Sequence, residues 1–103
     1  MNPNRLERAV AAHAALEAAN EKFEAAGIAF AAAIAPDRWA HEGAAAGIAL
    51  MASIKEIRAA ITSEDLPRES RRRARETAAR VDRVEATAKE LMTGRRLPVQ
   101  ELG

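Results

Sequence analysis

Cysteine and tyrosine are absent from this 103-residue chain, and its only serines are Ser53, Ser63 and Ser70. The lack of cysteine excludes disulfide bonds and thiolate metal sites. Neither histidine has the neighbours that a catalytic triad requires. Every glycine lies in or beside a helical segment, so no glycine-rich loop is available to hold a phosphate. We therefore expect a protein that is not an enzyme and that binds no metal and no cofactor.

Aromatic residues are scarce at 3%, and Phe23, Phe30 and Trp39 are the only large rings. Apolar residues make up 49% of the chain, but alanine dominates them. A core built mainly of alanine buries a modest apolar area. A small domain of this composition is therefore expected to gain stability by association.

The chain has no strong excess of charge, because 16 basic residues stand against 15 acidic ones for a net charge of +1. This balance gives no overall attraction to nucleic acid or to anionic lipid. The polar start of the sequence lacks the basic-then-apolar order of a signal peptide. Its apolar runs of about 11 residues are shorter than the roughly 20 that span a bilayer. The sequence thus favours a cytoplasmic protein without a membrane span.

Strand-like alternation is also missing, so the predicted fold class is all-α. Pro36 is expected to stop a first helix, Asp37 to cap a second, and Pro67 to begin a third. Gly94 is a candidate left-handed cap at the end of the third helix. The prediction is one domain over residues 1–94, with helices at about 4–35, 38–61 and 67–93, and an irregular tail at 95–103.

A short repeat on either side of a polar turn is the most informative feature. Residues 26–30 read AGIAF, and residues 46–50 read AGIAL. Small residues let helix backbones approach closely, so the first two helices are predicted to form a long hairpin in which Gly27 faces Gly47. The predicted packing and oligomer seam consists of Gly27, Phe30, Gly43, Gly47, Leu50 and Ile54.

The hairpin tip is apolar nearly all the way round, and something else must cover it. The Gly43–Gly47 spacing fits either tight packing inside the hairpin or a dimer interface. The third helix is densely charged around a weak apolar stripe and is expected to lie against the hairpin. Together these features predict a three-helix, bundle-like protomer. Two such protomers are expected to form a homodimer, which is itself a larger helix bundle. The stripe consists of Ala74, Ala78, Val81, Val84, Ala88 and Leu91.

The first helix carries a heptad-like pattern of three neighbouring rows. His13 and Asn20 fall on one row, where a polar residue can fix the register of the packing or can lie at its edge with access to water. The three rows are Leu6, His13, Asn20, Gly27 and Ile34; Ala9, Leu16, Phe23 and Phe30; and Ala12, Ala19, Ala26 and Ala33.

Two further features are candidates for partner binding. Trp39, in the hairpin turn, is either an exposed aromatic anchor or a ring folded back over Ile34 to close the end of the bundle. Arg71, Arg72 and Arg75 can share one face of the third helix and bind phosphates, or they can simply keep that face solvated. Glu69, Glu76 and Asp82 lie nearby, and no aromatic residue is interleaved for base stacking.

The function that these features favour is a non-catalytic, helical protein–protein interaction module that self-associates through its alanine- and glycine-rich hairpin. An adaptor, an assembly factor or a small inhibitor of a larger machine would fit, each with a protein partner. The alternative is a dimeric nucleic-acid-binding regulator that uses the arginine-rich face of the third helix.

Overall fold

The computed structural model describes the backbone of residues 3–102 and the side chains of residues 4–94. All the regular structure in residues 3–102 is helical, so the all-α prediction is confirmed. In chain order the elements are helix α1 (Pro3–Ala33), the short turn α2 (Pro36–Arg38), the π-helical turn η1 (Trp39–Gly43), helix α3 (Ala44–Ile61) and helix α4 (Arg68–Leu102).

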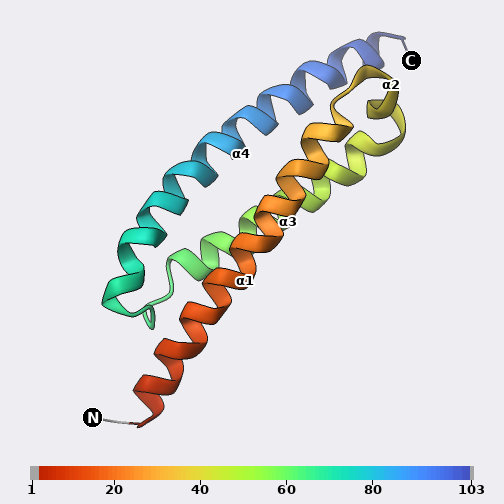
Figure 1. The fold of residues 1–103 in the computed structure, drawn as a ribbon. Helices are drawn as coiled ribbons and strands as arrows, with labels where there is room; N and C mark the ends of the chain where they lie inside the picture. The colour runs from red at the N-terminus through yellow and green to blue at the C-terminus, as the bar shows by residue number, and fades with distance from the viewer. Residues whose placement is uncertain (1–2, 103) are drawn as a thin grey trace.

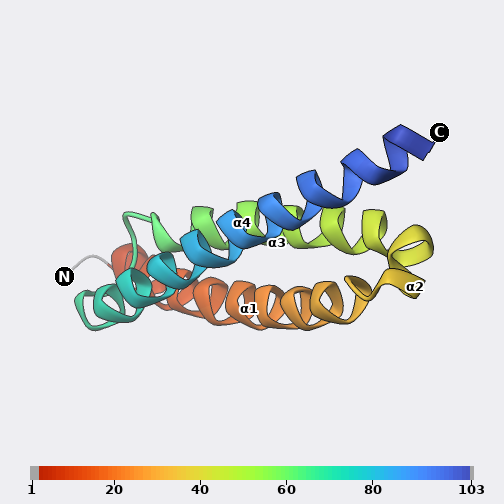
Figure 2. The ribbon, with the colours of Figure 1, turned by 90° about the horizontal axis from the view of Figure 1, so that it is seen from above.

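The molecule is a rod with dimensions of 63 × 19 × 18 Å. Helices α1 and α3 run antiparallel as the predicted hairpin, joined at the tip by α2 and η1 (Figure 1). Helix α4 returns along one side of this hairpin. Seen from above, α4 crosses the hairpin obliquely: it begins beside α1 and moves away from α1 towards its C-terminal end (Figure 2). One side of the hairpin is therefore covered by α4, and only in part.

Several element boundaries differ from the prediction. Helix α1 ends at Ala33 rather than residue 35, and α4 begins at Arg68 rather than at Pro67. The second helical segment begins at Pro36 rather than residue 38, and the wider turn η1 interrupts it before α3. Helix α4 continues to Leu102, which corrects the predicted irregular tail over residues 95–102. None of the described glycines has a positive φ, so Gly94 continues the helix instead of forming the expected left-handed cap. Gly103 lies outside the described residues.

The apolar core consists of two clusters. The larger one joins α1, α3 and α4, and the smaller one lies near the α3–α4 loop, where Leu66 packs against Leu16 and Ala74. The largest fully buried side chains are Leu16, Leu50, Ile57 and Val81, with no aromatic among them, which is the thin core that the composition predicts. The buried residues of the larger cluster are Ala19, Phe23, Phe30, Leu50, Ile54, Ile57, Val81 and Ala88.

Helix α1 buries the second and third of its three predicted rows, with Leu16, Ala19, Phe23, Phe30 and Ala33 all buried. The first row lies at the edge, because Asn20 and Gly27 are half-buried and Leu6 is 55% exposed. The polar residues of this row therefore lie at the side of the packing, where they can reach α4 and water.

Helix α4 packs through one stripe with alternating steps of four and three residues. Ala74, Val81 and Ala88 are buried, as the apolar pattern predicts, while Ala78, Val84 and Leu91 are half-buried. The stripe also buries Ser70 and Thr77, which an apolar pattern could not reveal. Short side chains at these two positions keep α4 close to the hairpin.

Candidate functional site

The predicted seam residues lie inside the protomer, with one exception. Phe30, Gly43, Gly47, Leu50 and Ile54 are buried, whereas Gly27 is only half-buried. The three apolar side chains of this set belong to the larger core cluster between α1, α3 and α4. The role of these residues in an oligomer remains a prediction, because their buried sides are occupied within the single chain.

Gly27 and Gly47 do not pack against each other, which corrects the predicted register. A Cβ added at Gly47 would lie 2.8 Å from Sδ of Met92 and 3.8 Å from Phe30, whereas one added at Gly27 would meet no atom within 4 Å. At Gly47 the space that the prediction gave to Gly27 is occupied instead by Met92 of α4. A half-open groove of about 290 Å³ remains beside Gly27, between α1 and α4.

Trp39 folds back onto the hairpin tip. Its ring is half-buried and packs edge-on against Phe30, with 6.0 Å between ring centroids and an interplanar angle of 82°. The opposite contact is Gly43, where an added Cβ would overlap the ring carbons. The structure therefore agrees with the second interpretation of Trp39, a ring that is folded back and closes the end of the core.

Polar and charged contacts join α1 to α4 along the first row of α1. Nδ1 of His13 lies 2.9 Å from Oγ of the buried Ser70, and Arg80 donates to Oδ1 of Asn20 over 2.7 Å. Arg73 pairs with Glu17 at 3.2 Å, and Arg80 also pairs with Glu24 at 3.3 Å. His13 and Asn20 therefore help to hold α4 in register.

Arg58 makes the corresponding link between α3 and α4. Its guanidinium donates to Glu85 at 2.6 Å and lies 3.0 Å from Asp82. The hydrogen bond to Glu85, followed by that to Asp82, raises the pKa of Arg58 above its ordinary value. Lys89 reaches the second oxygen of Glu85 at 3.7 Å. Through these contacts Asp82 and Glu85 of α4 face Arg58 of α3. Glu85 also faces Lys89, further along α4.

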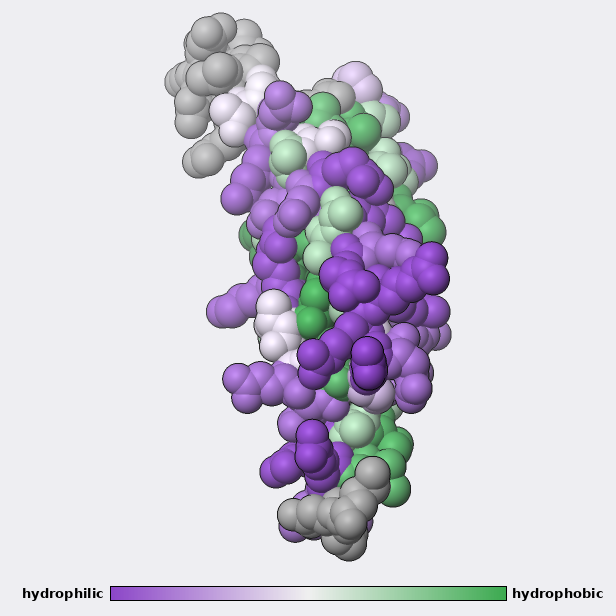
Figure 3. Space-filling view, turned by 90° about the vertical axis from the view of Figure 1, so that its left-hand side faces the viewer, coloured by the Kyte–Doolittle hydropathy of each residue, from purple (hydrophilic) through white to green (hydrophobic). Residues whose placement is uncertain are grey.

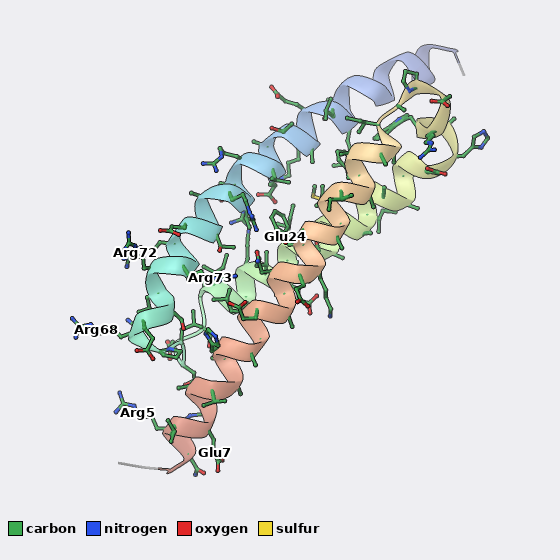
Figure 4. All side chains as sticks on the ribbon, viewed as in Figure 1. Arg5, Glu7, Glu24, Arg68, Arg72 and Arg73 are labelled. Atoms are coloured by element: carbon green, nitrogen blue, oxygen red, sulfur yellow. The ribbon has the colours of Figure 1, made fainter. Side chains whose placement is uncertain are left out.

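The predicted arginine candidates lie together at the start of α4. A shared hollow of about 510 Å³ is lined by Arg71, Arg72 and Arg75 and by Arg68, and all four are exposed. We call these four residues the arginine surface. Arg68 and Arg72 project away from the hairpin, whereas Arg73 points towards α1 (Figure 4). Arg68 was not among the predicted residues, although its spacing of three, four and seven residues from the others is the signal of a shared helix face.

A second hollow, the corner groove, adjoins the arginine surface where α3 ends and α4 begins. It has a volume of about 430 Å³ and is lined by four apolar side chains, by Thr62, Ser63 and Glu64 of the loop, and by Arg71 and Arg75 at its α4 side. Its apolar lining consists of Ile61, Leu66, Ala74 and Ala78. The sequence pattern did not indicate this groove, because a single leucine among turn residues gives no periodic signal.

The part of the chain described here, residues 4–94 with side chains, contains no group of three or more His, Asp or Glu residues placed to hold a metal ion. None of the described helices has both the length and the hydropathy needed to cross a bilayer. No family model, curated protein or solved structure matches this chain.

Proposed function

We propose that this chain is a non-catalytic, cytoplasmic protein–protein interaction module whose hairpin packs against the hairpin of a second copy. Adaptor, assembly factor and small inhibitor of a larger machine are the roles that such a module can fill. The proposal is supported by the surface of the hairpin, because α4 covers only one side of it (Figure 2) and large apolar side chains elsewhere on it stay exposed.

The observation that carries the proposal is the exposure of two equivalent isoleucines. Ile28 is 73% exposed and Ile48 is 72% exposed, and they occupy matching places in the AGIAF and AGIAL repeats. Exposed alanines follow the same repeat, so small side chains surround both isoleucines and would let a second helix approach closely. These alanines are Ala25, Ala29 and Ala32 on α1, and Ala45, Ala49 and Ala52 on α3.

The uneven distribution of hydrophobic residues over the surface fits self-association through the hairpin. Hydrophilic residues dominate the middle of the face shown in Figure 3, whereas hydrophobic patches gather along one edge. Exposed apolar residues grouped on one side of a small protein are typical of an interaction surface. Leu6 and Val10, 55% and 63% exposed, extend the apolar surface of α1 towards its N-terminus.

Light scattering on charge-insertion variants tests the proposal. Ile28→Glu combined with Ile48→Glu should convert a dimer into a monomer, because two unpaired carboxylates would be buried at the interface. Ala79→Glu combined with Ala86→Glu is the matched control, since both alanines are exposed on α4 and the added charge is equal. A monomeric mass for the unmodified chain, or equal masses for both double variants, would contradict self-association through the hairpin.

A dimeric nucleic-acid-binding regulator is the second candidate, favoured by the gathering of four arginines on one side of α4. The apolar floor of the adjoining corner groove has no counterpart in a phosphate backbone, so we rank a protein partner first. If the second candidate holds, replacing Arg71, Arg72 and Arg75 by alanine should weaken DNA or RNA binding. The slope of log affinity against log salt should then fall by about two to three, roughly one per lost phosphate contact.

A further inference from the structure

The corner groove combines an apolar floor with a basic rim. Its floor is formed by Ala74 and Leu66, each 4% exposed, and by the half-buried Ile61 and Ala78. Arg71 and Arg75 stand one helical turn apart on the α4 side of the groove, and both side chains are exposed. An occupant must therefore offer apolar side chains flanked by negative charge.

The net charge of the chain is only +1, but its charged side chains are unevenly distributed over the surface. On the inward sides of α4, Arg73 and Arg80 pair with Glu17 and Glu24 of α1. Asp82 and Glu85 likewise pair with Arg58 of α3. Of the three acidic residues that the sequence places near the arginine surface, Asp82 is thereby turned towards the hairpin.

The arginine surface keeps an excess of positive charge. Within the described part of the chain, Arg68, Arg71 and Arg75 make no ion pair, and Arg72 makes only an exposed one with Glu76 at 3.5 Å. Glu69 lies in the same first turn, and Glu64 lines the loop side of the groove, so some acidic charge remains nearby. Four arginines against these carboxylates leave the rim positive.

The arrangement is unfavourable for the protein alone. Arg68 and Arg72, like Arg71 and Arg75, are like charges at i,i+4 spacing, which destabilises a helix. Arg68 and Arg71 also lie in the first turn of α4, where the helix dipole is positive and acidic groups would be preferred. Carboxylates of a partner would relieve both effects.

We propose that the corner groove docks an acidic, amphipathic helix of a protein partner. The apolar side chains of that helix lie over Ala78 and Ile61, and its Asp or Glu residues pair with Arg71 and Arg75. Guanidinium groups suit this role because they bind carboxylates through two parallel hydrogen bonds. An apolar face laid into a groove is a common mode of peptide recognition. The inference rests on the proposed function in one respect, that the partner is a protein.

Fluorescence anisotropy with labelled probes tests the chemistry of the occupant. The first probe is a synthetic helical peptide of ~14 residues, with leucines on one face and glutamates beside them. The second is poly-glutamate of the same length, and the third is a DNA duplex of equal charge. The amphipathic peptide should bind at least about tenfold more tightly than either of the others. Equal or tighter binding of poly-glutamate or of the duplex would overturn the proposal.

Two pairs of variants locate the site. Arg71→Gln with Arg75→Gln should weaken binding of the amphipathic peptide at least about tenfold. Arg38→Gln with Lys55→Gln removes the same charge from exposed positions elsewhere and should leave binding unchanged. Ala78→Gln should block the groove, whereas Ala79→Gln, next to it but exposed, should not. Equal effects within either pair would overturn the proposal.

The same samples keep this inference separate from self-association. Because the corner groove lies at the opposite end of the hairpin from Ile48, the groove variants should keep the oligomeric mass of the unmodified chain. Loss of peptide specificity with the mass unchanged contradicts the docking site alone. A monomeric mass with specific peptide binding contradicts only the self-association.

Discussion

The ring of Trp39 lies directly over Gly43, one π-helical turn further along the chain. Seen from Gly43, Cδ2 and Cε3 of the ring occupy the space where a Cβ would stand. The other contact of the ring is the edge of Phe30 on α1. Gly43 thus allows the only tryptophan to close the tip of the core, and the glycine is needed for space rather than for backbone freedom, since its φ is −60°.

Replacing Gly43 by alanine should therefore destabilise the protein. Alanine is normally favoured over glycine inside a helix by about 1 kcal/mol, but here its Cβ must displace Trp39. We expect a net loss of about 1–3 kcal/mol, the usual range for overpacking, with a shift of tryptophan fluorescence. Gly27→Ala is the control, because a Cβ there meets open space. It should stabilise the protein by up to about 1 kcal/mol in chemical denaturation. The opposite order would show that the Trp39 contact is wrongly described.

Gly47→Leu tests the close packing of α4 on α3. The new side chain would meet Met92 and Phe30, and although Met92 can move, a whole isobutyl group requires larger shifts. We expect a loss of about 1–3 kcal/mol in free energy of unfolding. Ala86→Leu places the same side chain at an exposed position of α4, outside the proposed interface, and should change stability by less than about 0.5 kcal/mol. Similar melting temperatures for the two variants would contradict this packing.

The helices and the hairpin follow from the sequence because proline, small-residue repeats and heptad-like rows are local signals. Burial of Gly43, Leu50 and Ile54 agrees with the predicted packing seam. The partner of Gly47 does not, because it depends on the angle at which α4 crosses the hairpin. Local patterns also cannot reveal that Asp82 turns to Arg58 instead of shielding the arginine surface. The contribution of Leu66 to the corner groove is hidden for a similar reason, since it comes from a loop without periodicity.

Leu66→Ala should be among the most damaging single substitutions outside the hairpin. Leu66 is 4% exposed and packs against Leu16 and Ala74 in the smaller core cluster. Removing its side chain leaves a cavity where α4 joins the hairpin, and the expected loss is about 2–4 kcal/mol. Val10→Ala, at a 63% exposed position, should cost little. Urea denaturation followed by circular dichroism measures both, and equal midpoints would place Leu66 outside the core.

The ion pair between Arg58 and Glu85 should contribute weakly and should persist across the usual pH range. The pKa of Arg58 is raised by Glu85 and then by Asp82, so its stabilising effect is complete below the unfolded-state value and is lost only as pH rises through the raised one. The Arg58 side chain is 39% exposed, so water and salt screen the pair. A double-mutant cycle with Arg58→Ala and Glu85→Ala should give at most about 1 kcal/mol of coupling, falling further in high salt. Salt-independent coupling well above that value would contradict an exposed pair.

Sedimentation equilibrium of the unmodified chain, at tens of micromolar and physiological salt, tests the central claim most directly. If the exposed isoleucines of the hairpin pack against a second copy, the fitted mass should be twice the chain mass of 11.1 kDa and should fall on dilution. A single species of 11.1 kDa across the whole concentration range would contradict the claim that this hairpin is an interface between copies.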